Sequence, residues 1–327
     1  MSSEQGGFSS RIRPVFVTVL VTVLVGGLAA TLFSLFASFH WVFDLFTHFR
    51  VQYVWVFLGC SLAFGWLRQF RWVVVATLGL GINLPACLPF FIAQGKPLDV
   101  RRSSSDLRLL SFNLLSSNPK ETEVLAMLRE SDADVVLLME VNHRWQQALA
   151  ELKDRYPYQR IKSREDNFGI ALFSRKPLDS VSVEMFSGVP SIVASWHEQG
   201  QPVMLVGTHP VPPIGSTESA SRDSHMMGLA GYLAETTRPV IVAGDLNTTP
   251  FSAVYQDFIE QTTLRSSALG YGLSPTWGRP LWPLAIPIDH VLVSIDFEVL
   301  DFRVGGNHGS DHQVLIVDLR LRESPDE

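Results

Sequence analysis

Cysteine is scarce in this sequence, and its scarcity limits the kinds of site that the chain can build. The 327 residues include two cysteines, Cys60 and Cys87, and both lie in apolar stretches. Residues 100–327 contain none. A disulfide scaffold and a cysteine-ligated metal site are therefore excluded. A polar region without cysteine is compatible with an oxidising compartment and equally with the cytosol.

Basic residues are also fewer than acidic residues in the polar part of the chain. Residues 100–327 carry 20 Lys and Arg against 29 Asp and Glu, a net charge of −9 with His neutral. Proteins that bind nucleic acid usually show a basic patch or a raised pI. The composition therefore disfavours nucleic acid as the substrate, although composition does not exclude a local basic groove. The sequence also has no Gly-rich phosphate loop, GxSxG elbow or CxxC pair, so the motifs of those enzyme classes are absent.

Charged side chains are missing from three stretches near the start of the chain. No Asp, Glu, Lys or Arg occurs at 14–43, at 51–67 or at 72–95. A helix that spans a membrane needs about 20 apolar residues. The pattern predicts three transmembrane helices, at 14–39, 51–67 and 72–93, of which the second is the shortest. Aromatic residues near their ends are typical of membrane interfaces.

The alternative for this region is a cleaved signal peptide followed by a buried helical domain. The first apolar run is too long for the apolar region of a signal peptide, and two more runs follow it. Arg11 and Arg13 precede the first span, and Arg68 and Arg71 fill a short loop. The positive-inside rule then favours a cytoplasmic N-terminus. Three spans predict a multi-pass protein of the cell membrane whose polar part lies on the non-cytoplasmic side.

The composition predicts a division of the chain into five parts. The linker is polar and contains Gly, Pro and a run of Ser. Its thirteen residues span at most about 45 Å when extended, so the folded domain must work close to the bilayer. The parts are an N-terminal tail (1–13), a membrane anchor (14–93), the linker (94–106), a catalytic domain (107–320) and a C-terminal tail (321–327).

Short apolar runs alternate with helical patterns after the linker. Many strands with few helices between them predict two packed sheets covered by helices, and not one doubly wound sheet. Asn118, followed by Pro119, has the features of a helix N-cap. Strands are predicted at 107–113, 134–141, 169–174, 191–196, 203–208, 240–244, 290–294 and 314–319. Helices are predicted at 118–130, 143–154, 217–236 and 252–262.

Most of these strands end in, or lead into, a residue that can bind a metal or move a proton. Turns favour Asp and Asn in any protein, so one such ending is weak evidence. Six such strand endings in one domain indicate a functional site. The residues are Asn113, Glu140, His209, Asp245 with Asn247, Asp289 with His290, and Asp311 with His312.

This set suits the hydrolysis of a phosphoester. A hard divalent cation prefers oxygen ligands, which Glu140, Asp311 and Asn113 can supply. The metal would polarise a phosphoryl oxygen, and Asp245 would orient or deprotonate the attacking water. An imidazole with an acidic partner could stabilise the phosphoryl oxygens or help the leaving group. The alternative is a set of turn residues with a chance buried acid, but a Glu that ends an apolar run is costly unless it is paired or bound to metal.

These residues, in this order, resemble the endonuclease/exonuclease/phosphatase superfamily over about 107–320. The resemblance implies a four-layer α/β sandwich (αββα) and Mg²⁺ as the cofactor, with Mn²⁺ as the alternative ion. It also implies a role for each residue. Asn113, Glu140 and Asp311 would belong to the metal site, His209 would contact phosphate or donate a proton, Asp245 would activate water, Asn247 would bind phosphate, and Asp289 would pair with the catalytic His312.

One position departs from part of that superfamily. Leu115 stands where abasic-site endonucleases carry Asp, two residues after the first-strand Asn. This favours the phosphatase and lipase branches or general nucleases over DNA repair. Our leading hypothesis is a phosphoesterase that acts on a phosphoester or pyrophosphate bond of a membrane-associated substrate, such as a phospholipid or polyprenyl phosphate. A membrane-anchored nuclease and a non-catalytic binding protein are the rivals, and the oligomeric state stays open.

Several other residues are assigned lesser roles. His290 is expected to point away from Asp289, since neighbouring residues of a strand face opposite sides. Trp277 is expected to pack. Arg222, His225 and His308 are candidates for substrate contact only.

Overall fold

The computed structural model describes residues 4–92, 102–103, 106–278 and 282–322. The chain divides into two compact units, Met1–Pro89 and Phe90–Glu327. Most of the predicted linker, 94–106, lies outside the described residues.

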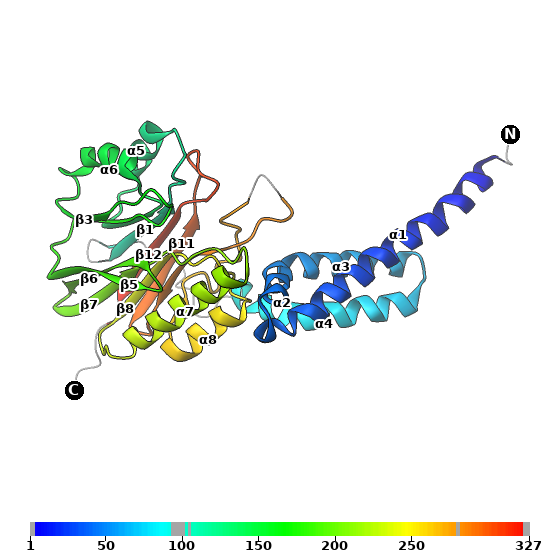
Figure 1. The fold of residues 1–327 in the computed structure, drawn as a ribbon. Helices are drawn as coiled ribbons and strands as arrows, with labels where there is room; N and C mark the ends of the chain where they lie inside the picture. Colours follow the sequence, from blue (N-terminus) through cyan, green and yellow to red (C-terminus); the bar gives the residue numbers. More distant parts are fainter. Residues whose placement is uncertain (1–3, 93–101, 104–105, 279–281, 323–327) are drawn as a thin grey trace. The chain divides into compact units, whose positions relative to one another are not determined.

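The first part of the chain is helical (Figure 1). Its α-helices are α1 (Glu4–Ser34), α2 (Trp41–Leu45), α3 (Arg50–Trp66) and α4 (Phe70–Phe91), with two short 3-10 helices, η1 (Ala37–Phe39) and η2 (Phe46–Phe49).

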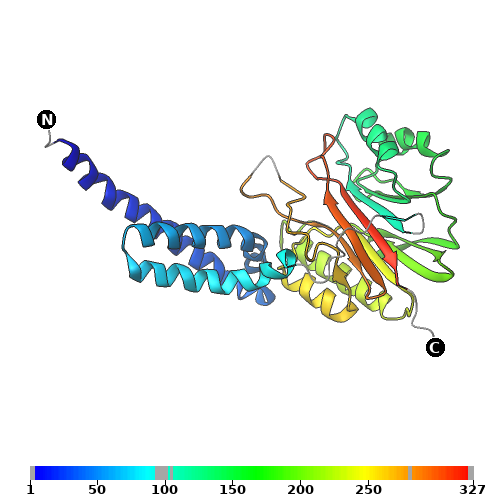
Figure 2. The same ribbon diagram turned by 180° about the vertical axis from the view of Figure 1, so that it is seen from behind.

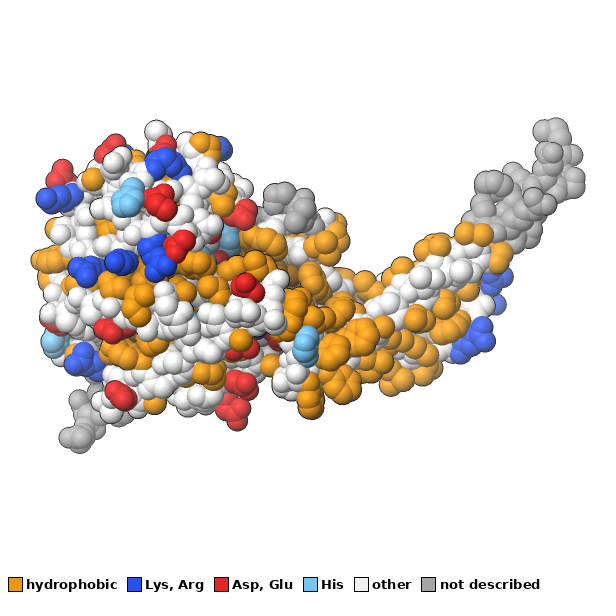
Figure 3. Space-filling view, viewed as in Figure 1, with side chains coloured by type: hydrophobic (Ala, Val, Ile, Leu, Met, Phe, Trp, Pro, Cys, Tyr) orange, Lys and Arg blue, Asp and Glu red, His pale blue; other side chains and the backbone are white. Residues whose placement is uncertain are grey.

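Two segments are long and apolar enough to cross a membrane, namely Arg13–Ser34 and Phe70–Phe91. The helix α3 has 17 residues and overlaps the second predicted span, 51–67, but it is not one of these two segments. The first helix ends at Ser34 and not at 39, because the chain turns there into η1 and α2. Hydrophobic side chains cover much of the visible surface of this unit (Figure 3).

The second unit contains two six-stranded sheets. The first has the order β11-β12-β1-β2-β4-β3, and the second has the order β5-β6-β7-β8-β10-β9. The strands are β1 (Leu107–Asn113), β2 (Val135–Met139), β3 (Tyr158–Lys162), β4 (Ile170–Ser174), β5 (Ser180–Phe186), β6 (Val189–Glu198), β7 (Gln201–Gly207), β8 (Val240–Asp245), β9 (Arg265–Ser266), β10 (Asp289–Val293), β11 (Phe297–Val304) and β12 (Leu315–Leu321).

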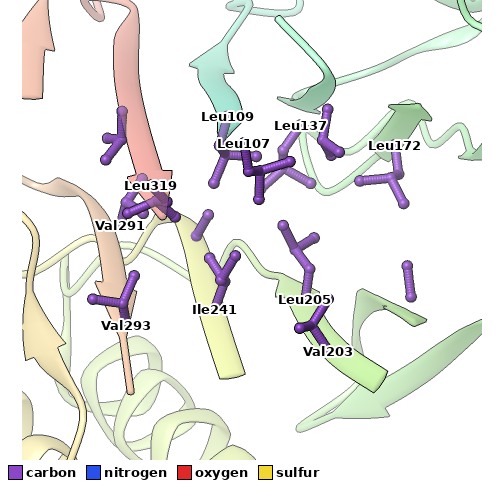
Figure 4. Packing of buried hydrophobic residues seen from close by; sticks show 14 of the residues in the cluster. Leu107, Leu109, Leu137, Leu172, Val203, Leu205, Ile241, Val291, Val293 and Leu319 are labelled. Carbon is purple, nitrogen blue, oxygen red and sulfur yellow. The ribbon is translucent and has the colours of Figure 1, made fainter. Parts of the chain in front are cut away.

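The two sheets pack face to face over an apolar core. Leu137 and Leu172 from the first sheet meet Leu205 and Ile241 from the second (Figure 4). The outer face of the first sheet carries α5 (Glu121–Glu130) and α6 (His143–Leu149, continued by the 3-10 helix η3, Ala150–Leu152) (Figures 1 and 2). The outer face of the second carries α7 (Ser216–Leu233) and α8 (Ala253–Thr262). This arrangement confirms the predicted αββα sandwich.

The pairing of the strands gathers the predicted residues at one edge of each sheet. In the first sheet, β1 and β2 are parallel, so Asn113 at the end of β1 lies beside the residue that precedes Glu140. The strand β12 is antiparallel to β1, so its start, which follows His312, lies at the same end. In the second sheet, β7 and β8 are parallel and β10 is antiparallel, with Asp289 opposite Asp245. We call the edge that contains Asn113 and Asp245 the site edge.

Each predicted strand is present, and four strands were not predicted. The missed strands are β3, β5, β9 and β11. The prediction that Asn118 caps a helix was wrong, because α5 begins at Glu121. The Asn118 side chain is used in a turn, where its Oδ1 accepts a hydrogen bond from the backbone N–H of Lys120 and its Nδ2 donates to the carbonyl of Leu114.

Candidate active site

The two sheets meet at Asn113. Its Nδ2 lies 3.1 Å from Glu140 Oε1 in the first sheet and 3.1 Å from Asp245 Oδ2 in the second. The other oxygen of Glu140, Oε2, accepts hydrogen bonds from the backbone N–H and the hydroxyl of Ser116. Glu140 has a positive φ of 59°, which is uncommon for a residue with a side chain. These bonds fix its carboxylate against Asn113.

Asp245 forms the centre of the site. Its Oδ2 lies 3.4 Å from His209 Nε2 and 3.5 Å from His312 Nε2, and its Oδ1 accepts a hydrogen bond from the backbone N–H of Asn247. Burial by itself would raise the pKa of this carboxyl. The charge of His312 and the hydrogen bond from His209 outweigh it and lower the pKa to about 2. Asp245 is therefore an ionised acceptor, better suited to orienting water than to holding its proton.

His312 is held between two carboxylates. Its Nδ1 lies 2.8 Å from Asp289 Oδ2, and its Nε2 faces Asp245. Burial disfavours the charged ring, but the carboxylates of Asp289 and Asp245 raise its pKa to about 10. At neutral pH the ring is an imidazolium, which can donate a proton or a hydrogen bond through Nε2.

Asp311 connects the network to a residue that the sequence did not single out for the site. Trp277 Nε1 donates a hydrogen bond to Asp311 Oδ2 at 2.9 Å, and the Trp277 backbone bridges to His312. Asp311 Oδ1 lies 4.0 Å from His312 Nε2 and has no hydrogen-bond partner among the described residues. Trp277 was expected to pack, and no sequence signal marks its contact with Asp311, because the two residues are 34 positions apart.

Asn247 and His209 complete the predicted set. The Nδ2 of Asn247 donates to the carbonyl of Pro210 at 2.9 Å, which occupies one of its two amide protons and leaves the other for a ligand. The ring of Phe168 lies 5.6 Å from that of His209. The Nδ1 of His209 has no hydrogen-bond partner among the residues that the structure describes.

A second polar cluster supports the strand that leads to His209. The hydroxyl of Thr208 lies 2.6 Å from His225 Nε2 and 2.7 Å from the hydroxyl of Ser191. Gly244 allows the close approach of this strand end, because a Cβ there would lie 1.9 Å from the Thr208 carbonyl. His225 therefore lies behind the site and not in it, and burial lowers its pKa to about 4.

The remaining candidates also lie away from the network. His290 contacts the carbonyl of Thr248 and the ring of Tyr255 of α8, on the side of the sheet opposite Asp289. Arg222 is buried in α7. His308 faces Glu123 of α5.

The charges of the network favour a bound cation. The network contains four carboxylates (Glu140, Asp245, Asp289 and Asp311) and two imidazoles (His209 and His312), with Glu140 joined through Asn113, so two negative charges remain even if both rings carry a proton. Uncompensated charge in such a place is costly. The two carboxylates at the more exposed side of the network are Glu140 and Asp311. A divalent ion would therefore balance the network.

Two sets of residues could hold that ion. Ligand atoms of Asp245, Asp289 and His312 lie within 4.8 Å of one another. Both nitrogens of His312 already face carboxylates, however, and a protonated ring cannot ligate a metal. Glu140 and Asp311 offer carboxylate oxygens, including the unpartnered Asp311 Oδ1, which is the ligand chemistry that Mg²⁺ prefers. Asn113 offers Oδ1, which also accepts a hydrogen bond from the backbone N–H of Leu115.

A sequence model described as the endonuclease/exonuclease/phosphatase family matches residues 110–312. No curated protein sequence matches the chain.

Solved structures show the same fold at low sequence identity. An endonuclease/exonuclease/phosphatase from Beutenbergia cavernae is 23% identical, with 69% of this chain and 74% of that chain covered and a TM-score of 0.55. A humanized TDP2 of D. rerio is 17% identical (66% and 100% covered, TM-score 0.56). The sphingomyelinase C of Streptomyces griseocarneus is 18% identical (65% and 99% covered, TM-score 0.51). At these identities the likeness carries the fold and no further assignment.

Proposed function

This chain belongs to the endonuclease/exonuclease/phosphatase family, and from that premise we propose that it is a membrane-anchored, divalent-metal-dependent phosphoesterase. Its substrate would be a phosphorylated lipid, either a phospholipid or a polyprenyl phosphate. One observation carries the catalytic part of the proposal. Eight polar residues from both sheets form one network, which Asn247 joins through its backbone N–H, and the carboxylates of the network outnumber its imidazoles by two.

The proposed metal ligands are Asn113, Glu140 and Asp311, with Mg²⁺ as the ion and Mn²⁺ as the alternative. When bound, the ion would polarise a phosphoryl oxygen and offset negative charge in the displacement. The chain's own residues supply the rest. Asp245 Oδ2 would accept a hydrogen bond from the attacking water and hold it in line with the phosphorus. Because the pKa of Asp245 is low, its main contribution would be to orient the attacking water.

Two groups would bind the phosphoryl oxygens. The imidazolium of His312 would donate through Nε2, and Asp289 at Nδ1 would hold the ring in place and keep it charged. The remaining amide proton of Asn247 would donate to a second oxygen. His209 Nε2, on the other side of Asp245, would contact the phosphate or donate a proton to the leaving group.

The choice of a lipid substrate rests on two features of the chain. Two segments are long and apolar enough to cross a membrane, and the polar part of the chain has a net charge of −9, which disfavours nucleic acid. We further propose that α1, α3 and α4 all span the cell membrane and place the catalytic domain on the non-cytoplasmic side. A reporter fused to the C-terminus tests that topology.

A substrate comparison tests the function. The full chain in lipid nanodiscs would be given phosphatidic acid, a polyprenyl phosphate, a nucleotide and supercoiled plasmid, each with Mg²⁺ and with excess EDTA. We expect phosphate release from a lipid that EDTA abolishes. Strong plasmid nicking with no lipid turnover would favour the nuclease alternative. No turnover together with no heat of Mg²⁺ binding in calorimetry would favour a non-catalytic binding protein.

A further inference from the structure

Two loops at the site edge carry exposed apolar side chains, and we infer that these side chains dock the edge onto the surface of the lipid bilayer. The docking surface, which we call the apolar rim, consists of Ile214, Trp282 and Leu284. The inference rests on the membrane anchoring in the proposed function. It does not depend on catalysis.

The rim is an exception within a unit that otherwise buries its large apolar side chains. Ile214 is 78% exposed, Trp282 is 79% exposed and Leu284 is 56% exposed. The other exposed large apolar side chains among the described residues of this unit are Phe91 and Ile92 at its start, and Tyr158, Met185 and Ile295, which lie in or beside three different strands. Single exposed apolar residues are ordinary, whereas a group around one site indicates a binding surface.

Both loops of the rim emerge at the site edge. Ile214 lies between β7 and α7, five residues after His209. Trp282 and Leu284 lie between Trp277 and Ile286, which pair as an antiparallel bridge. Trp277 also bridges to the backbone of the catalytic candidate His312, so the base of this loop is fixed to the site.

The composition of the loops suits a bilayer surface better than water. Residues 210–217 contain no charged side chain, and residues 277–288 contain no acidic side chain and one basic one, Arg279, within a region whose net charge is −9. Tryptophan favours the membrane interface, because its ring is apolar and its N–H can still be hydrated. The rim is therefore a part of the acidic domain that anionic lipids would not repel.

The contacts of Phe90 favour a bilayer over another partner. Within the second unit, the Phe90 ring packs on Phe251 with 6.3 Å between centroids, and the Phe90 carbonyl accepts a hydrogen bond from the backbone N–H of Gly272. Phe251 follows β8 by six residues and so lies at the site edge. Phe90 is also near the end of an apolar segment proposed to span the membrane. The chain therefore enters the second unit beside the site edge, directly after the segment proposed to span the membrane, and this favours a bilayer as the partner of the edge.

Lipid quenching of a fluorescent label tests the inference in the full chain. Both native cysteines would be replaced (Cys60→Ala and Cys87→Ala), and single cysteines introduced as Ile214→Cys or Leu284→Cys would carry a bimane label. The protein would be placed in nanodiscs of phosphatidylcholine and phosphatidylglycerol with and without a shallow doxyl lipid. The control is Ile295→Cys, which replaces a side chain that is 65% exposed in the turn after β10, at the edge opposite the site.

We expect the doxyl lipid to reduce fluorescence at 214 and 284 roughly twofold more than at 295, because interfacial side chains enter the headgroup region. Equal quenching at the three positions would overturn the inference. Disulfide cross-links between two Ile214→Cys chains without quenching would overturn it too, since the rim would then bind a second copy. Quenching does not require turnover. An inactive but quenched protein would therefore refute the proposed activity alone, and an active but unquenched one would refute the rim alone.

Substrate preference provides a second measurement. For Trp282→Ser with Leu284→Ser, the ratio of activity on a lipid phosphate in vesicles to activity on soluble bis(p-nitrophenyl) phosphate should fall about tenfold, as the loss of apolar burial predicts. The control Ile295→Ser should leave the ratio unchanged. An unchanged ratio in the rim variant would contradict the inference.

Discussion

The helical unit and the sandwich use the same apolar residues in opposite ways. In the helical unit, large side chains such as Trp55, Leu62 and Trp66 are more than 60% exposed. In the sandwich, Leu137 and Leu205 are fully buried between the sheets. Apolar surface avoids water, so exposure on this scale fits the membrane anchoring that we propose for the helical unit. Under that proposal the two units face different solvents, and an exposed apolar residue indicates a binding surface only in the sandwich.

The largest expected effect concerns the polar network, which only the sandwich contains. Asp245→Asn and His312→Gln should each reduce turnover on the preferred substrate about a thousandfold or more, because each removes a charge that acts on the reacting groups. Residues that act as a unit are not additive, so the double variant should lose little more than the worse single variant. Initial rates at saturating Mg²⁺ measure this. The exposed control Asp257→Asn on α8 should retain full activity, and a strictly multiplicative double variant would argue against a single network.

Core truncation tests whether the two units differ in what stabilises them. Leu137→Ala should lower the free energy of unfolding of the sandwich by about 2–5 kcal/mol, because it leaves a cavity between the sheets. Leu62→Ala, at a side chain that is 67% exposed, should cost less than about 0.5 kcal/mol. Chemical denaturation of the full chain in micelles, followed by fluorescence, measures both. Equal losses would contradict the distinction between a water-excluded core and a lipid-facing surface.

Acid should weaken the sandwich through His225. Burial, and then the nearby His209, lower the folded-state pKa of His225 from 6.5 to about 4. The unfolded chain therefore binds this proton first, and stability is fully present above pH 6.5 and is lost as the pH falls toward 4. The loss is about 3 kcal/mol at pH 4. Denaturation of the wild type and of His225→Gln between pH 4 and 7 measures it, and the variant should show a shallower dependence. Parallel curves would show that His225 does not titrate as stated.

A smaller effect is expected at Trp277. Trp277→Phe removes the hydrogen bond to Asp311 Oδ2 while it keeps an aromatic ring. Because Trp277 holds a proposed metal ligand in place, the Mg²⁺ concentration for half-maximal activity should rise about tenfold. Calorimetry with Mg²⁺ provides a readout independent of turnover. If the variant lowers the maximal rate and leaves Mg²⁺ affinity unchanged, Trp277 acts on the substrate and not on the metal ligand.

The sequence predicted the central strands well and the edge strands poorly. The strands β2 and β4 are buried on both faces and appear as continuous apolar runs. The edge strand β3 alternates between exposed and half-buried residues, and the edge strand β11 contains Glu298, Asp301 and Arg303, so neither forms an apolar run. Whether one face of an edge strand is buried depends on its contacts with distant parts of the chain. The local sequence pattern contains no information on those contacts.

The candidate catalytic residues could be identified along the chain, because strand ends are local features and a carboxylate or imidazole at the end of an apolar run is visible in the sequence. Which of these residues contact one another depends on the folded structure. The contacts of Asn113 with Asp245 and of Trp277 with Asp311 join positions 132 and 34 residues apart. The folded structure also decided the charge of His312, since that charge depends on two carboxylates brought from another sheet. Distance along the chain does not limit an electrostatic contact, whereas distance in space does.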